Sequence, residues 1–471
     1  MRRLAATAAA MVVLVTGFAA CSDDEFNPGP GAETTAGRWK TWALTSSAEI
    51  DVPSPPTGAD AEREADEVRQ LSSSKTAEDE ASIARWGQSI AVKPWLEMNM
   101  ELVAAGVKDP PLASRGYALT SIAMYDAVVA AYHWKYEHGR EGPEGDKAGP
   151  DPSYPSEHAA IAGAASRILT YLFPDRPFGL FDELAEEAAE SRVKAGANFR
   201  SDVEAGLELG RAVAEKVLAR AKADGSDQTW DGQRPAGIGT GIEYWQPAPG
   251  TVAPPTQPLA GVWKPWVLES GKEFRAGPPY AYGSPEFLAE VREVMEVRKN
   301  ITPEQEQIAR FWAGGQGTPS PPGLWNQIAL VYAAEAKMTT PRAARLFAAL
   351  NVAESDAALS VWDTKFTYWT ARPINAIRDL GLDPTWTPVL TTPNFPSYVS
   401  GHAGYSGAAA VVLSHFFPAN AGTFEAKAQE AAISRLYGGI HYASDNNVGL
   451  DMGHKVGRKV VDVIKRDGSE I

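Results

Sequence analysis

Residues 394–417 read NFPSYVSGHAGYSGAAAVVLSHFF, and this stretch indicates how the chain folds. A Pro- and Gly-containing entry precedes a long run of small and apolar residues, which predicts a helix over 403–417 that begins just after a Ser-Gly turn. A second stretch, DPSYPSEHA at 151–159, resembles the beginning of the first. The same entry into the same kind of helix is therefore expected in both halves of the chain.

The likeness between the two halves extends well beyond this stretch. Five pairs of segments resemble one another in the same order, with 224 to 244 residues between the copies. Chance could supply one such pair but not five in register, so we predict a duplicated helical module whose copies pack as a pseudo-symmetric pair. The pairs are 37–47 with 261–271, 82–86 with 307–312, 124–135 with 354–365, 151–159 with 394–403, and 190–210 with 433–453.

Helical periodicity dominates the rest of the chain. Apolar residues recur at i, i+3, i+4 and i+7, and several of these segments begin after Ser, Thr or Asp or carry Pro in their first turn. Alternating strand patterns are scarce, so the predicted fold class is all-α, with two pseudo-symmetric helical bundles. The predicted helices cover 115–134, 156–173, 199–223, 285–297, 303–314, 341–365 and 403–417.

Composition narrows the classes of function. The 471 residues can bury a large core, and an apolar content of 44% with 14 tryptophans argues against disorder. The net charge of −15 makes nucleic acid an unsuitable partner, because no extensive basic surface can form. A phosphate-like ligand would therefore need a local cationic pocket.

The N-terminal segment MRRLAATAAAMVVLVTGFAAC resembles a bacterial secretory signal. Arg2 and Arg3 precede an apolar run that is too short to span a bilayer, and Cys21 follows directly after it. Cys21 is the only cysteine, and in an exported protein it is either a free thiol or a lipid attachment point; its position favours lipid. We expect an exported bacterial lipoprotein, periplasmic or on the cell surface, held to the membrane by this anchor alone.

These patterns divide the chain into five parts. A signal peptide is expected at 1–20, a tether at 21–36, an N-terminal repeat at 37–225 and a C-terminal repeat at 261–471. Between the repeats, the Pro- and Gly-rich stretch at 226–260 predicts an ordered or semi-ordered connection.

Cationic residues in the C-terminal repeat have the chemistry of a tetrahedral oxyanion site. Arginine offers planar bidentate donors, lysine a point charge, and a Ser-Gly turn at a helix start adds backbone N–H groups and a favourable dipole. One histidine can act as nucleophile or direct ligand and a second as general acid or base. Asp445 lies four residues after His441, so in a helical segment it could fix the His441 tautomer. The predicted site comprises Lys365, Arg372, Ser400, Gly401, His402, Arg435, His441 and Asp445.

Three motifs that contain these residues are similar to the signature of the vanadium-dependent haloperoxidase and type-2 phosphatidic acid phosphatase superfamily. All the spacings fit, and three motifs in order are a strong signal. The motifs are Lys365-x6-Arg372-Pro373, Pro396-Ser397-x2-Ser400-Gly401-His402, and Ser434-Arg435-x5-His441-x3-Asp445.

The resemblance implies a role for each of the predicted site residues. Lys365, Arg372 and Arg435 are expected to bind the oxygens of vanadate or phosphate, with hydrogen bonds from Ser400 and the Gly401 N–H. A separate group is expected to perform the chemistry: His441 as the residue that binds vanadium or attacks phosphorus, and His402 as the acid or base.

Two aromatic positions indicate which branch of the superfamily the chain resembles. Trp362 precedes the site lysine by three residues, Phe395 precedes Pro396, and both look like pocket residues of the haloperoxidase branch. The resemblance therefore implies peroxide-dependent oxidation of halide with vanadate as cofactor. The alternative is an acid phosphatase that works through a phosphohistidine without a cofactor, and a third hypothesis is a non-catalytic oxyanion-binding lipoprotein. The expected partners are small molecules: peroxide, halide or a phosphate ester.

The N-terminal repeat supplies a second version of the site. Lys135, Arg192 and Asp202 correspond to Lys365, Arg435 and Asp445, whereas Gly142 replaces Arg372 and Asn198 replaces His441. Glu157 stands where Gly401 does, at a point where it would repel an approaching anion. Since asparagine has no basic ring nitrogen, we predict one working site, in the C-terminal repeat.

Overall fold

The computed structural model describes residues 33–106, 109–143 and 150–469, and within these ranges the chain is built from α-helices. The all-α prediction is confirmed, and the described residues form no sheet beyond a single bridge between Tyr244 and Thr370. The helices are α1 (Ala59–Ser73), α2 (Ala77–Trp86), α3 (Lys93–Gly106), α4 (Pro110–His138), α5 (Glu157–Leu172), α6 (Leu180–Lys194), α7 (Arg200–Ala221), α8 (Pro285–Asn300), α9 (Pro303–Phe311), α10 (Ser320–Glu335), α11 (Thr340–Tyr368), α12 (Pro373–Asp379), α13 (Gly401–Phe416), α14 (Ala421–Tyr437) and α15 (Ala443–Ile464).

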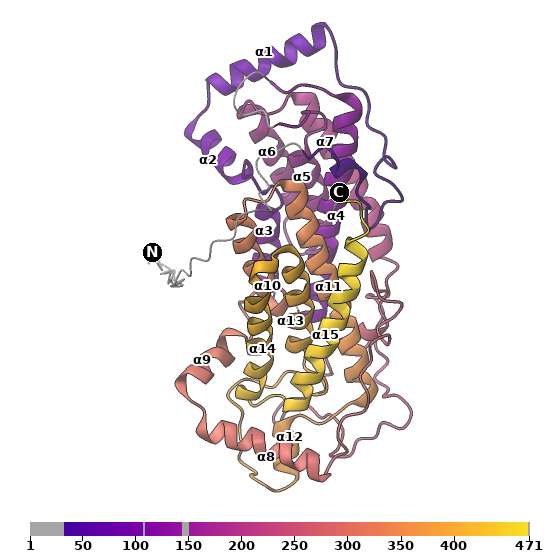
Figure 1. The fold of residues 1–471 in the computed structure, drawn as a ribbon, viewed down its shortest axis with the longest axis vertical. Helices are drawn as coiled ribbons and strands as arrows, with labels where there is room; N and C mark the ends of the chain where they lie inside the picture. Colours follow the sequence, from indigo (N-terminus) through magenta and orange to yellow (C-terminus); the bar gives the residue numbers. More distant parts are fainter. Residues whose placement is uncertain (1–32, 107–108, 144–149, 470–471) are drawn as a thin grey trace.

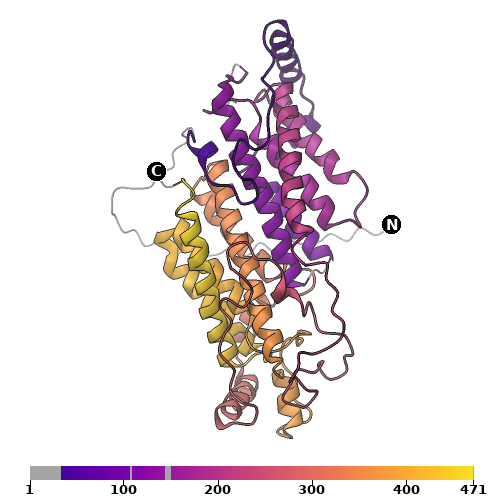
Figure 2. The ribbon, with the colours of Figure 1, turned by 90° about the vertical axis from the view of Figure 1, so that its right-hand side faces the viewer.

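The molecule is elongated, and its two halves meet along the longest helices. In Figure 1, α1 and α2 lie at one end, whereas α8, α9 and α12 lie at the other. Figure 2 shows the helices of the first repeat, indigo to magenta, leaning against those of the second, orange to yellow. The central contact is between α4 and α11, each 29 residues long.

The predicted duplication is confirmed element by element. Helices α5 and α13 each have 16 residues, and α7 and α15 each have 22. One buried carboxylate in each repeat accepts three backbone N–H groups from a loop more than 80 residues earlier in the chain. Asp126 accepts from residues 42–44, and Asp356 accepts from residues 266–268. Such recurring polar detail follows from a duplicated fold, because helical propensity alone does not require it.

Small residues let α13 approach α15 closely. A Cβ added to Gly407 would lie 2.5 Å from the Leu450 carbonyl, and one added to Gly453 would lie 2.1 Å from the Gly404 carbonyl. These distances are far below van der Waals contact, so each glycine is required by the packing of the two backbones. The N-termini of both helices carry predicted site residues, so this packing brings the site together.

The predicted helices agree with the observed ones to within a few residues at most ends. The predicted tether is too long at its C-terminal side, because Glu33 is buried and its carboxylate accepts hydrogen bonds from Thr339 and Arg342. The predicted signal peptide and Cys21 lie outside the described residues. Within the described part of the chain, no helix has the length and apolar character needed to cross a membrane.

The connection between the repeats packs on the second repeat. The backbone N–H of Trp245 donates to the Trp369 carbonyl at 2.5 Å, and Trp362 Nε1 donates to the Thr256 carbonyl at 3.2 Å. Trp369 has a left-handed backbone, with φ of 52°, which ends α11 and turns the chain toward Arg372. The connection therefore supports the segment that carries one of the predicted site arginines.

Candidate active site

The tertiary structure brings together every predicted residue of the C-terminal site. They come from five places in the second repeat, all at element ends or in the turns between them. Lys365 lies in the last turn of α11, Arg372 is the N-cap of α12, Ser400, Gly401 and His402 begin α13, Arg435 lies near the end of α14, and His441 and Asp445 flank the start of α15.

Lys365 and Arg372 are fixed by backbone carbonyl groups. Lys365 Nζ donates to the carbonyl oxygens of Pro396 and Ser397 at 2.8 and 3.0 Å, and Arg372 Nε donates to that of Phe395 at 2.7 Å. Both cations are fully buried. The 395–397 turn therefore orients two positive charges without neutralising either of them.

Arg372 also contacts the ring of His441. Its Nη1 donates to the Ile440 carbonyl at 2.7 Å and lies 3.0 Å from His441 Nε2. Because a guanidinium only donates, Nε2 must be the accepting nitrogen and its lone pair must face the cationic cluster. A ligand atom that bonds Nε2 would replace this hydrogen bond.

His441 and Asp445 form the expected pair, although not across a helical turn. His441 Nδ1 lies 2.8 Å from Asp445 Oδ2, but His441 precedes α15, which begins at Ala443. Asp445 is the third residue of this helix, and its Oδ2 also accepts the N–H of Tyr442 at 3.3 Å. Helix capping thus brings the carboxylate to the ring, fixes the proton on Nδ1 and leaves Nε2 as the unprotonated nitrogen.

His402 lies beside Arg435. The Arg435 Nη1 is 3.4 Å from His402 Nε2, while Nη2 donates to the Ala309 carbonyl at 2.9 Å. The backbone of Trp312 and Ala313 also hydrogen-bonds the imidazole. Burial, and then the charge of Arg435, lower the pKa of His402 well below its usual value of 6.5. His402 is therefore neutral at pH 7 and can exchange protons with a ligand that brings negative charge.

The cluster carries more positive than negative charge. Burial lowers the pKa of Arg372 and of Arg435 to about 9, so both remain charged at neutral pH. Burial also lowers the pKa of Lys365, and Asp445 supplies one opposing carboxylate. Arg372 Nη2 is buried without a hydrogen-bond partner among the described residues. A tetrahedral oxyanion fits this environment, because it would supply both the missing acceptor and the missing negative charge.

Gly401 contributes a backbone N–H and no side chain at the first position of α13. A Cβ added there would meet the rings of Trp362, at 3.5 Å, and Tyr405, at 3.8 Å, and both distances are ordinary contacts. Nothing in the surrounding protein therefore requires glycine, and the absence of a side chain leaves room for a ligand.

The Gly401→Ala variant is expected to bind phosphate about tenfold more weakly while keeping its stability, because the methyl group would shield the N–H from the anion. Isothermal titration with phosphate and urea unfolding would measure the two effects. Gly404→Ala is the matched control: its Cβ would lie 2.5 Å from Val361 Cγ2, so stability should fall by about 1–3 kcal/mol. Unchanged phosphate affinity in Gly401→Ala would show that the N–H does not contact the anion.

The two predicted aromatic residues lie beside the cations. The Phe395 ring is 4.9 Å from both Lys365 Nζ and the Arg372 guanidinium carbon, and its centroid is 5.1 Å from that of Trp362. The faces of these rings attract the cations and exclude water. Trp362 is fully buried, so it shapes the wall of the site from behind.

Several further residues support the site, and the sequence alone did not indicate them. Ser397 Oγ donates to Asp445 Oδ2 at 2.5 Å, Ser434 Oγ accepts from Arg435 Nε at 2.9 Å, and Glu290 accepts the Ser444 N–H at 2.6 Å. Both serines lie inside the motifs, so their positions could have suggested these roles. Glu290 lies in α8, far away in sequence, and no local pattern indicated it.

Anion-free protein is expected to lose stability through His441 as the pH falls below about 6.5. Burial, followed by the charge of Arg372, lowers the pKa of His441 well below 6.5, so the unfolded chain binds its proton first. Burial raises the pKa of Asp445 to about 6, so the folded protein binds this proton before the unfolded chain does. Between pH 6 and pH 4, Asp445 therefore adds stability as the pH falls, opposite to the effect of His441. Between pH 7 and pH 5, the free energy of unfolding of the His441→Asn variant should fall less steeply than that of the wild type. The two slopes should differ by up to about 1.4 kcal/mol per pH unit. Equal pH dependence in urea unfolding of both proteins would contradict the burial of a neutral imidazole.

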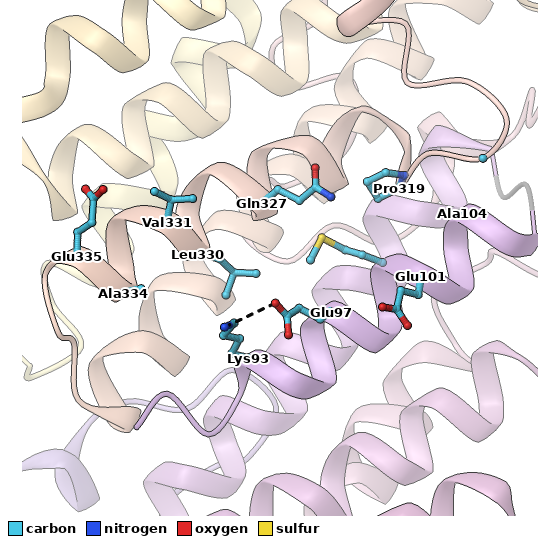
Figure 3. A pocket seen from close by; sticks show the side chains of 12 residues that line it. Lys93, Glu97, Glu101, Ala104, Pro319, Gln327, Leu330, Val331, Ala334 and Glu335 are labelled. Atoms are coloured by element: carbon cyan, nitrogen blue, oxygen red, sulfur yellow. Dashed lines mark ion pairs between the residues drawn. The ribbon is translucent and has the colours of Figure 1, made fainter. Parts of the chain in front are cut away.

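A groove among the described residues lies away from this cluster. It has a volume of about 740 Å³ and runs between α3 and α10, with Met100 and Leu330 on its walls (Figure 3). Lys93 Nζ lies 3.8 Å from Glu97 Oε1 in this groove. None of its lining residues belongs to the predicted site, so the cationic cluster is distinct from this groove.

Comparisons with known proteins agree with this fold. The family model described as the VCPO second helical-bundle domain matches residues 175–225, 345–422 and 419–468. Vanadium chloroperoxidase from Curvularia inaequalis is 24% identical over 415 residues, which cover 70% of this chain. The matched region is 66% of that relative, so the chain spans just under two thirds of its length.

Two solved structures have similar folds. A bacterial vanadium-dependent iodoperoxidase is 28% identical, with a TM-score of 0.67, covering 79% of this chain and 95% of that one. The holo form of a bacterial vanadium-dependent chloroperoxidase is 15% identical, with a TM-score of 0.60 and the same two coverages. At that lower identity the likeness supports the fold alone.

Proposed function

Because the chain belongs to the superfamily of vanadium-dependent haloperoxidases and type-2 phosphatidic acid phosphatases, we propose that it is a haloperoxidase-like enzyme. The proposed reaction is the oxidation of a halide by hydrogen peroxide, with vanadate held at His441. The observation that carries the proposal is the group of three buried cations around an imidazole whose Nε2 lone pair faces them.

Each residue then has a defined task. Lys365, Arg372 and Arg435 hold the oxyanion and disperse its negative charge in a site with little water. His441 offers Nε2 as a ligand, while Asp445 keeps the proton on the other ring nitrogen. Vanadate, when bound, supplies a Lewis-acidic centre that activates peroxide.

His402 has the task of moving protons. Its Nε2 lies within 3.4 Å of Arg435, at the start of a helix whose N-terminus favours anions. A neutral imidazole in this position can take the proton of an incoming peroxide and return it to a departing oxygen. The residue therefore serves a reaction that both consumes and releases protons at one oxyanion.

A phosphatase on the same site is the second candidate. Its specific support is the His441–Asp445 pair, because an oriented imidazole with an unprotonated Nε2 is also a suitable nucleophile toward phosphorus. The phenyl ring of Phe395, 4.9 Å from two of the cations, favours the haloperoxidase, because an aromatic residue at this position resembles that branch. Phosphate and vanadate share their charge and tetrahedral shape, so both would occupy the same cations.

One pair of assays on purified protein separates these reactions. The protein is freed of oxyanions, reloaded with or without vanadate, and tested for peroxide-dependent bromination of an organic dye and for hydrolysis of a phosphate monoester. Bromination that requires vanadate is the expected result. The haloperoxidase proposal fails if vanadate binds without any bromination, and phosphoester hydrolysis that vanadate inhibits would establish the phosphatase instead.

A further inference from the structure

We propose that the first repeat contains a second oxyanion pocket, and that the ligand of this pocket is the carboxylate of Glu157. The pocket lies at the start of α5, in the place that corresponds to the start of α13. It keeps three basic groups of the working site: Lys135, His158 and Arg192, the counterparts of Lys365, His402 and Arg435. The inference concerns a different site from the proposed catalytic one.

The Glu157 carboxylate lies between two of these groups, Lys135 and His158. Its Oε2 is 3.0 Å from Lys135 Nζ, and its Oε1 is 3.8 Å from His158 Nε2. Lys135 is almost fully buried, and its Nζ also donates to the Pro152 carbonyl, as Lys365 does to the Pro396 carbonyl. The lysine therefore has the same backbone support in both repeats, and in the first repeat it has a carboxylate as well.

Arg192 is the third basic group of the pocket. Its Nε is buried without a hydrogen-bond partner among the described residues. Burial lowers the pKa of Arg192, and the charge of Glu157 acts against that shift. A donor of this kind is suited to an additional oxygen acceptor, which a tetrahedral anion would supply and a two-oxygen carboxylate does not.

Glu157 remains ionised in this environment. Burial alone would raise its pKa, but the charge and hydrogen bond of Lys135 act against this, and the net pKa is lowered to about 2. Burial, and then the charge of Arg192, lower the pKa of His158 to about 4, so at neutral pH this imidazole is uncharged and Lys135 is the cation beside the carboxylate. The pocket consequently holds an anion at every physiological pH without taking one from solution. Glu157 therefore does more than repel an approaching anion, because its carboxylate also neutralises buried cations that would otherwise destabilise the repeat.

The local backbone explains why one residue can close this pocket. Ser156 caps α5 and Ser400 caps α13, each accepting an N–H three residues later at 3.4 Å. The next residue, Glu157 or Gly401, is the first of its helix, and the Glu157 side chain reaches Lys135. Whether a carboxylate of the chain itself occupies the pocket is therefore determined mainly by this position.

The pocket would bind an anion without catalysing a reaction. Asn198 replaces the ligand histidine, and its Nδ2 donates to the Ser153 carbonyl at 3.2 Å. Asp202 pairs with Arg140 at 2.9 Å, an arginine two residues before the position that aligns with Arg372. Arg140 Nη2 also donates to Glu64 Oε2 at 2.7 Å, so its guanidinium is paired with two carboxylates. Basic groups for binding remain, but no imidazole occupies the ligand position.

Counting bound anions tests the proposal. Isothermal titration with inorganic phosphate is expected to show one more site per chain in Glu157→Gly than in the wild type. Adding Lys135→Met should remove the extra site. Glu183→Gln, which removes an exposed carboxylate of α6, is the charge-matched control and should add no site. The count is a difference between variants, so it does not depend on whether the catalytic site binds phosphate.

A second variant guards against loss of folding. Glu157→Ala keeps a good helix former at the first position of α5, and its thermal midpoint should rise with phosphate by more than that of the wild type. An extra phosphate site that Lys135→Met abolishes supports the proposal. Folded Glu157→Gly or Glu157→Ala protein with no additional phosphate and no additional stabilisation would overturn it.

Discussion

Replacing His441 with alanine is expected to reduce kcat/KM for peroxide-dependent bromination by at least about a thousandfold. The substitution removes the Nε2 that faces the cations, and with it the ligand atom proposed for vanadate. It also leaves the carboxylate of Asp445 without its imidazole partner. Steady-state rates at saturating vanadate, together with the dissociation constant for vanadate, measure the effect.

Two comparisons make this result specific. His454→Gln is the matched control, because His454 lies on α15 with its Nε2 3.0 Å from Glu425 Oε2, outside the site. It should keep the wild-type rate. Lys365, Arg372 and Arg435 remain in His441→Ala, so that variant should still bind phosphate, although more weakly. Substantial bromination by His441→Ala would refute both its proposed role and the prediction of a single working site.

The Gly401→Glu variant is expected to close the catalytic site from within. The new carboxylate would stand beside Lys365 as Glu157 stands beside Lys135, so phosphate and vanadate affinity should fall by at least about a hundredfold. The anion-free protein should also become more stable, because a buried cation gains a partner. Titration calorimetry and thermal unfolding without oxyanions would measure these two effects.

The neutral variant Gly401→Gln distinguishes charge from size. Glutamine has nearly the same shape as glutamate, and a Cβ at this position meets Trp362 and Tyr405 at ordinary contact distances. It should weaken anion binding less than Gly401→Glu and should not stabilise the anion-free protein. Equal effects of the two variants would mean that bulk alone closes the site, and that the carboxylate of Glu157 is not a surrogate ligand.

Much of the fold was predictable because it depends on local pattern. Helical periodicity identified α4, α5, α7, α11 and α13, and five matched segments identified the duplication. Helix ends were less certain: α4 extends from Pro110 to His138, whereas the apolar pattern predicted 115–134. The tether was extended too far, because the pairing of Glu33 with Arg342 joins residues 309 positions apart.

The candidate site was also readable from motifs, because the spacing within each motif reflects a short local structure. The pairing of His441 with Asp445 was expected, but its geometry was not: the contact crosses a helix start, where the carboxylate also caps Tyr442. Glu290 was missed, because its contact with Ser444 spans 154 residues. Long-range contacts of this kind leave no periodic trace in one sequence.

The sequence by itself determined the helical class, the duplication and the identity of the cationic residues, since these follow from periodicity and spacing. Only the tertiary structure decided which of these cations are buried and which have a carboxylate that neutralises their charge. Burial leaves Lys365, Arg372 and Arg435 with excess positive charge, because backbone carbonyls orient them without cancelling that charge. In the first repeat Glu157 cancels the charge of its neighbours. Gly142 and Asn198 already distinguish the first pocket in the sequence, whereas the contact of the Glu157 carboxylate with Lys135 is visible only in three dimensions.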